Sequence, residues 1–409
     1  MPAFNVVALG ARDYYQVAIA LHQRGLLGRL ITDFYRYRFL RKFSAKRVSP
    51  DLPDSKVFSS WPHAIGLFLL RGARFNKARR YLVDFSFGFL AAFVTFLGPN
   101  QAIVYSYYLE GFCAFYRLIR SRPKCLICFQ VHPTPWFINS IMAEDASRFR
   151  KYADVTFASD IEGTFDKRDY QRYRRATKMC HGLIAASQVT IRSVVSSETS
   201  FMPVCIAHYG SKLSGRSSVL ATPNPAREQI HILSVCQLTQ RKGLHWAFEA
   251  MKRLAPYEQA YYAWTIVANI VDPQVLALMP SNATIVQNLS DKELADQIQL
   301  ADVFLLPSLI EGFGLVYVES LSQGTPIVYT ENTGARDICT NGVHGFCVPI
   351  SDLDSLVALL QQQLSDRQLL SSLRQNCIDL TTQVTWSRFR KLVSDFAANS
   401  SANNFTPSD

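Results

Sequence analysis

Several motifs that would assign a function directly are missing from this 409-residue chain. It contains no Gly-x-x-x-x-Gly-Lys-Ser/Thr loop, which argues against a nucleotide hydrolase, and no Gly-x-Gly-x-x-Gly sequence follows its first predicted strand. No motif of a nucleic-acid-binding module is present, which argues against nucleic acid as a partner. The nine cysteines form no metal-ligand grouping, and the closest pair, Cys125 and Cys128, lies in an apolar run that predicts two buried strand cysteines.

Long hydrophobic runs are also lacking. The best candidate, residues 82–97, is shorter than the roughly 18 to 20 apolar residues that a membrane span needs, and it contains Asp84. We therefore predict a buried helix there, with a shallow membrane contact as the alternative. Residues 1–7 do not resemble a signal peptide, so a reducing cytoplasm is the expected location.

Acidic residues are scarce relative to basic ones. The chain has 43 Lys and Arg against 32 Asp and Glu, a net charge of +11, and basic residues gather with aromatic ones at 36–43 and 71–80. Such a surface suits anionic lipid headgroups at the inner face of a membrane, because cations are attracted there and aromatic rings settle at the interface. An acidic acceptor, nucleic acid and a merely solvated basic face are the alternatives.

What the chain does contain indicates a globular protein. Hydrophobic residues make up 48% of the sequence and charged residues 18%. The length exceeds the roughly 250–300 residues at which a single core stops growing, so we expect two domains.

The stretch 302–326 organises the rest of the chain. Residues 303–306 form an apolar run typical of a strand buried on both faces, and the Gly-Phe-Gly sequence 312–314 leads into a predicted helix over 315–322. A glycine loop that feeds a helix start exposes unpaired N–H groups and the positive end of the helix dipole. This arrangement attracts phosphate.

Two glutamates flank this loop and helix. Glu319 lies eight residues after Glu311, a little over two helical turns, so both carboxylates can lie along one side of the element. A carboxylate only accepts hydrogen bonds and is suited to holding vicinal hydroxyls. We predict that Glu311 meets a sugar and that Glu319 holds a ribose diol. A solvated helix face is the alternative, but the apolar residues between the two glutamates leave little polar face.

The segment from Pro307 to Glu319 resembles the EX7E signature of the retaining glycosyltransferases of family four. The resemblance implies the α/β fold called GT-B, in which two Rossmann-like domains face each other across a cleft and a C-terminal helix returns to the first domain. It also implies a nucleoside-diphosphate sugar bound by the second domain and an acceptor bound by the first. Neither a cofactor nor a metal ion is expected.

A second segment resembles the family pattern Gly-Arg-Leu followed by Lys-Gly, whose two cations neutralise the donor phosphates. Lys242 and Gly243 match this pattern, but Gln237 stands where the family has arginine and lacks its permanent, bidentate charge. Arg241 compensates for the difference, or the donor binds more weakly, or activity is lost. The donor site that the resemblance implies comprises Gln237, Arg241, Lys242, Asn288, Leu289, Gly312, Phe313, Gly314, Leu315 and Glu319.

Three residues in the first half complete the predicted site. Gly10 and Ala11 form the turn after the first predicted strand, where glycine permits close approach of the backbone to a ligand. His132 follows a predicted strand at 125–131, and a structural histidine beside a proline turn is the alternative to a functional one. The resemblance implies that Gly10 and Ala11 face the cleft and that His132 joins Glu311 at the reacting centre.

An Asp-x-Asp pattern at Asp352 and Asp354 would suggest a metal-dependent transferase of the GT-A type. These residues immediately precede an amphipathic segment, 353–364, and helix capping explains them without a metal ion.

The predicted domains are residues 1–215 on the acceptor side and residues 216–385 on the donor side. A helix over 386–398 crosses back to the first domain, and residues 399–409 are expected to be disordered. The predicted function is metal-independent transfer, with retention, of a sugar from a nucleoside-diphosphate sugar to a glycan, lipid or small-molecule acceptor. A catalytically weakened nucleotide-sugar-binding or scaffold protein is the alternative, because of Gln237, and an epimerase of similar fold is a third.

Overall fold

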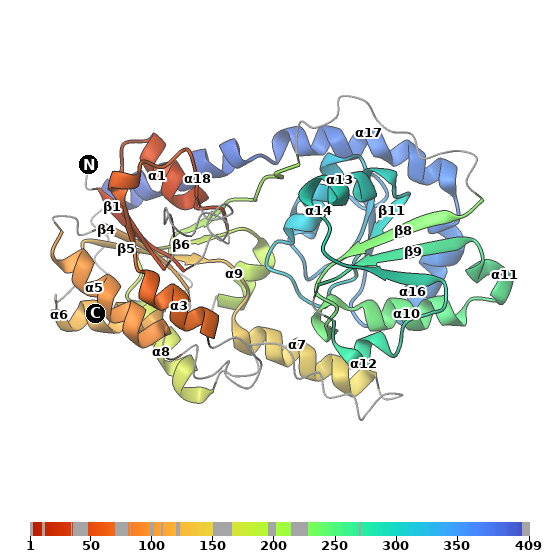
Figure 1. Ribbon diagram of the computed structural model, residues 1–409, viewed down its shortest axis with the longest axis horizontal. Coiled ribbons are helices and arrows are strands. Elements are labelled where there is room, and N and C mark those ends of the chain that lie inside the picture. The colour runs from red at the N-terminus through yellow and green to blue at the C-terminus, as the bar shows by residue number, and fades with distance from the viewer. Residues whose placement is uncertain are drawn as a thin grey trace.

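The computed structural model shows two parallel sheets, each surrounded by helices (Figure 1). The predicted α/β fold with two domains is therefore confirmed. The structure describes residues 3–9, 13–33, 35, 48–69, 81, 83–98, 102–107, 109–119, 123–149, 166–194, 202–213, 228–269 and 271–402.

The first domain contains a seven-stranded sheet in the order β3-β2-β1-β4-β5-β6-β7, with every neighbouring pair parallel. Its strands are β1 Phe4–Val7, β2 Leu27–Thr32, β3 Val57–Ser59, β4 Ala102–Ser106, β5 Cys125–Gln130, β6 Gly182–Ala185 and β7 Val204–Ile206. Its helices are α1 Gln16–Gln23, α3 Trp61–Leu69, α5 Gly88–Phe96, α6 Glu110–Ile119, α7 Pro135–Arg148, α8 Lys167–Lys178 and α9 Gln188–Val194, with short turns at Asp54–Lys56 and Val83–Phe87.

The second domain contains a six-stranded parallel sheet in the order β10-β9-β8-β11-β12-β13. Its strands are β8 Ile230–Val235, β9 Tyr262–Val267, β10 Ala283–Val286, β11 Val303–Leu305, β12 Ile327–Thr330 and β13 Gly345–Val348. Its helices are α10 Leu244–Arg253, α11 Pro256–Gln259, α12 Pro273–Leu276, α13 Asp291–Leu300, α14 Leu315–Ser322, α15 Ala335–Ile338, α16 Leu353–Leu359 and α17 Arg367–Gln383, with short turns at Gln240–Lys242 and Leu360–Leu364.

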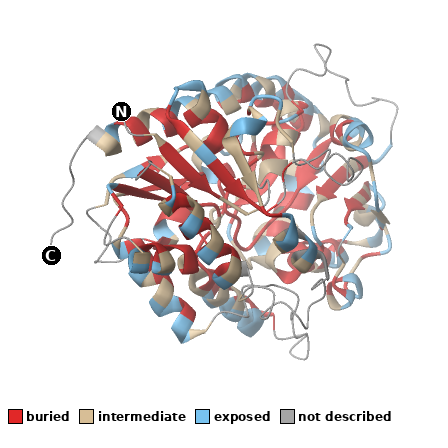
Figure 2. Cartoon of the chain, turned by 60° about the vertical axis from the view of Figure 1, so that its left-hand side comes forward, coloured by how far each residue is buried: buried red, intermediate tan, exposed pale blue. Residues whose placement is uncertain are grey.

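The apolar runs at 125–131 and 303–306 were predicted to form buried strands, and the structure has β5 and β11 there. Every residue of β5 and β11 is buried, as expected for strands covered by helices on both faces. In Figure 2 the strands are largely red, the colour of buried residues. Cys125 and Cys128 lie on β5 and are buried free thiols, which confirms their predicted structural role.

Helices α18 (Trp386–Ala402) and α7 link the two domains. Helix α18 crosses from the second domain to the first (Figure 1), where it packs beside α1 and Arg390 donates a hydrogen bond to Gln16. Residues 399–402, predicted to begin a disordered tail, instead continue this helix, and 403–409 lie outside the described residues. Helix α7 follows β5 of the first domain but packs Ile138 and Ile141 into the core of the second.

The prediction of a buried helix near residues 82–97 is wrong in one respect. Helix α5 buries its small residues, including Gly88 and Ala92, and leaves Phe89 and Phe93 half exposed. The small residues face α6, because a Cβ on Gly88 would lie 2.7 Å from the Phe112 nitrogen. Among the described residues, no helix is long and apolar enough to span a membrane. The predicted basic clusters at 36–43 and 71–80 lie outside the described residues.

Candidate active site

The glycine loop between β11 and α14 lies against the first domain. A Cβ on Gly312 would come within 2.7 Å of the Val131 carbonyl oxygen, so only glycine fits at this approach. The Gly312 carbonyl accepts hydrogen bonds from Ser187 and Thr190, both at the start of α9. Gly314 has a φ of 82° and immediately precedes α14, whose first N–H groups point back toward the loop. The loop therefore places a helix start where the two domains meet.

Glu311 is buried and forms an ion pair with Lys242. Burial alone would raise the pKa of the Glu311 carboxyl, but the positive charges of Lys242, Arg241 and His132 lower it to about 2. Glu311 is consequently ionised at neutral pH. His132 comes from the first domain and Glu311 from the second, so the two residues predicted for the reacting centre are near each other across the domain boundary.

Lys242 is held by a tight turn. Gln240–Lys242 form a single 3-10 turn that ends at Gly243, which has a φ of 70°. A Cβ on Gly243 would lie 1.9 Å from the Pro307 carbonyl oxygen, and the Leu309 N–H donates to the Arg241 carbonyl at 2.8 Å. The Lys-Gly pair of the sequence therefore packs directly against the strand end that precedes Glu311.

Gln237 lies just after β8 and is exposed. Its carbonyl accepts a hydrogen bond from the Thr239 N–H at 2.9 Å, which starts the turn that carries Lys242. Arg241 is near enough to Glu311 to lower the pKa of that carboxyl, so this domain presents two cations to the site.

Glu319 has different surroundings from Glu311. Burial raises the pKa of its carboxyl, and Asp291 raises it further, whereas Lys212 opposes the shift. The Nζ atom of Lys212 lies 3.0 Å from the centre of the Tyr14 ring. Burial and the charges of Glu319 and Asp291 raise the pKa of Tyr14 to about 12. Sequence reasoning missed Tyr14 and Lys212, since neither belongs to a motif.

The turn after β10 also carries an unusual backbone. Asn288 has a φ of 58° and is exposed, and its N–H donates to the side chain of Asn269 at 2.8 Å. Leu289 follows it and is half-buried just before the capping residue of α13.

Two predicted donor residues pack against the first domain. Phe313 is buried, and its ring lies against Tyr209 and His208 with centroid distances of 5.3 and 5.8 Å. Leu315 is half-buried and packs against the same core. These contacts hold the glycine loop in position.

His132 lies two residues after the end of β5, and its carbonyl accepts a hydrogen bond from the Gln130 side chain at 2.7 Å. A Cβ on Gly312 would lie 3.0 Å from its Nδ1 atom, so the histidine ring faces the glycine loop. The ring also lies edge-on to Tyr107 at 6.4 Å between centroids.

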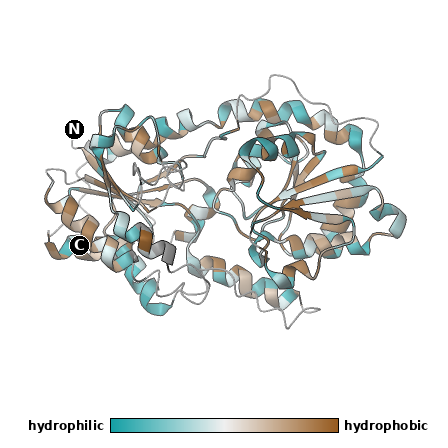
Figure 3. Ribbon diagram, in the orientation of Figure 1, coloured by the Kyte–Doolittle hydropathy of each residue, from teal (hydrophilic) through white to brown (hydrophobic). Residues whose placement is uncertain are grey.

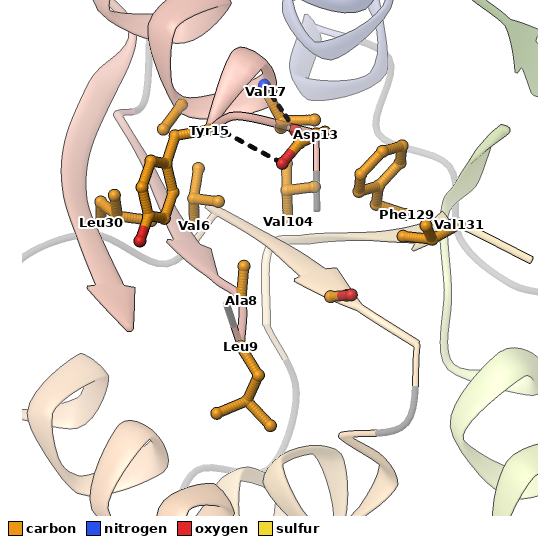
Figure 4. Close-up of a pocket in the computed structure, with 12 residues that line it drawn as sticks. Val6, Ala8, Leu9, Asp13, Tyr15, Val17, Leu30, Val104, Phe129 and Val131 are labelled. Atoms are coloured by element: carbon orange, nitrogen blue, oxygen red, sulfur yellow. Dashed lines mark hydrogen bonds between the residues drawn. The ribbon is translucent and has the colours of Figure 1, made fainter. Parts of the chain in front are cut away.

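An apolar cavity lies at the carboxyl ends of β1 and β4, next to the start of α1 (Figure 4). Asp13 is the one acidic side chain in its lining; it accepts hydrogen bonds from the N–H groups of Tyr15 and Val17, and burial raises its pKa. Gly10 and Ala11 lie outside the described residues, but Leu9 and Asp13 on either side of them both line the cavity.

Asp145, near the end of α7, is a further buried carboxylate that sequence reasoning missed. It accepts hydrogen bonds from four side chains of the second domain, at distances between 2.5 and 3.1 Å. Burial alone would raise the pKa of Asp145, but the bonds from the donors bring it below its ordinary value. The donors are Gln240, His245, Trp246 and Ser351. Because Gln240 begins the turn that carries Lys242, Asp145 anchors that turn to α7.

The Asp-x-Asp pattern caps a helix, as predicted. The Asp352 carboxylate accepts from the Ser355 N–H at 3.0 Å at the start of α16, and Asp354 pairs with Arg253 on the surface. Across the described ranges, no group of three or more His, Cys, Asp and Glu side chains is arranged to hold a metal ion.

Residues 221–380 match the sequence profile of the family described as glycosyl transferases group 1. This range contains Glu311, Glu319 and Lys242. Among curated proteins, the chain is 28% identical over 145 residues to the amylovoran biosynthesis glycosyltransferase AmsK of Erwinia amylovora, covering 32% of this chain and 35% of that protein.

It is 31% identical over 85 residues to the UDP-Gal:alpha-D-GlcNAc-diphosphoundecaprenol alpha-1,3-galactosyltransferase of Escherichia coli, covering 21% of this chain and 22% of that protein. The matched segments thus span about a third or less of these two relatives.

Solved structures match over almost the whole chain. The Anabaena protein HepE in complex with UDP and glucose superimposes with a TM-score of 0.62 at 14% identity, covering 97% of this chain and 99% of that one. The sucrose-phosphate synthase of Thermosynechococcus elongatus gives 0.63 at 17% identity, covering 97% and 98%. These similarities confirm the predicted GT-B fold.

Proposed function

We propose that this chain, which carries a glycosyl transferases group 1 domain over residues 221–380, transfers a sugar from a nucleoside-diphosphate sugar to an acceptor. The observation that carries the proposal is the ion pair between buried Glu311 and partly buried Lys242, beside the start of α14. A buried carboxylate paired with a partly buried cation at a helix start suits a ligand that has both hydroxyls and phosphates.

The departing diphosphate would be stabilised by charge. Lys242, Arg241 and the first N–H groups of α14 would face the negative charge that develops on the leaving group, and fixed groups of this kind lower the barrier without reorganising. A bound diphosphate would compete with Glu311 for Lys242, which frees the Glu311 carboxylate for the hydroxyls of the donor sugar. This scheme needs no metal ion.

The remaining residues would orient the donor. Glu319 would accept hydrogen bonds from the ribose hydroxyls, with Lys212 and Tyr14 beside it. His132 would reach the reacting centre from the first domain, since it faces Gly312. We assign no residue as a covalent nucleophile, and we propose retention by front-face attack of the acceptor. A fold neighbour, a trehalose-6-phosphate synthase, is described as a retaining enzyme.

The neighbours also suggest which substrates to try first. HepE was crystallised with UDP and with UDP-glucose, so a UDP-sugar is the donor we propose to test first. One relative acts on a sugar linked to diphosphoundecaprenol, so a lipid-linked sugar is one acceptor to test, beside glycans and small molecules.

The second candidate function is a nucleotide-sugar-binding or scaffold protein without turnover. The observation that favours it is Gln237, which is exposed at the end of β8 and leaves that position without a cation. An arginine there would add a third cation for the diphosphate, beside Lys242 and Arg241.

Release of UDP from UDP-sugars distinguishes the two candidates. We expect the native chain to release UDP slowly by hydrolysis and faster with an acceptor, and Lys242→Met to lower this rate by roughly a hundredfold or more, as for other groups that stabilise a leaving charge. Lys252→Met, on the exposed end of α10, is the matched control and should keep the rate. Nucleotide binding without release of UDP from any donor would favour the scaffold.

A further inference from the structure

Helix α5, the turn before it and the residue after it present a row of large apolar side chains to solvent. Phe85, Phe89, Phe93 and Leu97 recur every four residues, and between 45% and 68% of each is exposed. Four-residue spacing places such side chains on one face of a helix. We call these four residues the α5 row.

Helix α5 has a second face that packs on the core, so the exposure of the α5 row is not explained by poor packing of the whole helix. The opposite face of α5 packs its small residues closely on α6, as the contact between Gly88 and Phe112 shows. Burying a phenylalanine side chain stabilises the folded chain more than burying an alanine side chain does, because more apolar surface leaves water. The helix nevertheless turns its largest apolar side chains outward, which indicates that they serve a contact outside the chain.

Neighbouring residues widen this apolar face. The Phe115 ring of α6 lies edge-on to Phe85 and Phe89, with centroid distances of 6.1 and 5.3 Å. Leu118, also on α6, is 82% exposed. In Figure 3, α5 is largely brown, and α5 and α6 lie at the end of the molecule away from the second domain (Figure 1).

A basic helix borders the row. Helix α8 contains six lysines and arginines and one aspartate. It packs on α6, and Arg172 joins it to the row by pairing with Asp84 and lying 4.9 Å over the Phe85 ring. Four of its cations are exposed, namely Lys167, Arg168, Arg175 and Lys178.

We propose that the α5 row and helix α8 together form a docking surface for an anionic lipid bilayer, with the phenylalanines entering the interface and the cations of α8 meeting the headgroups. Aromatic and apolar side chains flanked by cations suit this partner, since the rings settle at the headgroup boundary and the charges are attracted to the anionic surface. A second copy of the chain is a poorer occupant, because a symmetric contact would bring two basic helices together.

The proposal does not depend on sugar transfer, and binding to vesicles tests it without any nucleotide. We would measure sedimentation of the full chain with phosphatidylcholine vesicles that contain or lack phosphatidylglycerol. We expect binding only to the anionic vesicles, weakened by added salt because the attraction is screened.

Two double variants separate the contributions of the two parts. Phe89→Ser with Phe93→Ser removes the centre of the row, and Arg175→Gln with Lys178→Gln removes two cations of α8. Each should lower binding to anionic vesicles by roughly tenfold or more, as expected for losing two interfacial groups. Circular dichroism would verify that each variant is folded, which the exposure of all four side chains predicts.

Matched controls lie on the other domain. Tyr257→Ser with Tyr261→Ser removes two exposed aromatic residues, and Lys252→Gln with Arg253→Gln removes two exposed cations. Both should leave binding unchanged. Absence of binding to anionic vesicles, or equal losses in variants and controls, would overturn the proposal. So would a dimer in light scattering that the Phe89/Phe93 variant dissociates, because the row would then join two copies.

Discussion

Glu311 is the residue whose surroundings say most about the site. Its carboxyl is buried, yet three positive charges hold its pKa at about 2 instead of the ordinary 4.5. A group whose pKa is lowered on folding adds stability above its ordinary pKa, and this contribution is lost as the pH falls through the folded value. The shift corresponds to about 3 kcal/mol in the free energy of unfolding.

We therefore predict a specific effect of acid on the native chain. Between pH 4.5 and pH 2, the free energy of unfolding should fall by about 3 kcal/mol more for the native chain than for Glu311→Gln, because the amide does not titrate. Urea unfolding at a series of pH values measures the difference. The same pH dependence in both chains would contradict the assignment of the ion pair.

For Glu319 we predict the opposite effect of the carboxylate charge on the stability of the unliganded chain. Burial raises the pKa of its carboxyl, so the charged form at neutral pH is unfavourable in the unliganded chain. Glu319→Gln should raise the thermal midpoint of the unliganded protein at pH 7, and the gain should shrink as the pH is lowered and the native carboxyl becomes protonated. A lower midpoint for the variant would show that Glu319 is a structural acceptor.

The sequence was informative about these two residues for a physical reason. The Gly-Phe-Gly loop, the apolar strand before it and the helix after it are consecutive, so local spacing was enough to indicate both glutamates. Tyr14 and Lys212 were not predictable, because they approach Glu319 from the first domain and from the segment after β7. Neither residue lies in a sequence motif that would indicate a functional role.

At the scale of elements, α7 carries a role that its sequence did not indicate. Its Asp145 accepts hydrogen bonds from residues about 100 positions later, among them Gln240 in the turn that carries Lys242. Contacts at that separation leave no periodic pattern in the chain. The prediction that helix α5 is buried failed for a related reason. The helix is apolar throughout, so its sequence does not reveal which face packs against the protein and which is exposed.

Removing the Asp145 carboxylate should destabilise the folded chain. Asp145→Ala leaves His245, Trp246, Gln240 and Ser351 without their acceptor in a buried site, and we expect a loss of about 3–5 kcal/mol in the free energy of unfolding. Urea unfolding measures it. Glu144→Ala is the matched control, because Glu144 is exposed, pairs only locally with Arg148, and should change stability by no more than about 0.5 kcal/mol. Equal effects of the two substitutions would refute the anchoring role.

The whole molecule depends on α18, which returns from the second domain and completes the first. Phe389 of this helix is fully buried against Phe129, Tyr209 and Trp386, whereas Leu392 on the same helix is 36% exposed. The sequence indicated this crossing only through resemblance, since an amphipathic helix does not reveal which of two domains it covers.

We predict that Phe389→Ala destabilises the chain by about 3–5 kcal/mol, the usual result of emptying a large buried site, and that Leu392→Ala costs far less. Differential scanning calorimetry distinguishes the domains if they unfold separately, and the loss should then appear in the transition of the first domain. A loss confined to the second domain would contradict the described packing.

The most direct test of the donor site is the thermal midpoint of the purified chain with nucleoside diphosphates, UDP first. Ligands that bind the native state raise this midpoint by mass action. The donor assignment predicts a shift with one nucleobase, lost or much reduced in Glu319→Ala and retained in Glu228→Ala, an exposed glutamate of the same domain. No shift with any nucleoside diphosphate at millimolar concentration, or an undiminished shift in Glu319→Ala, would contradict it.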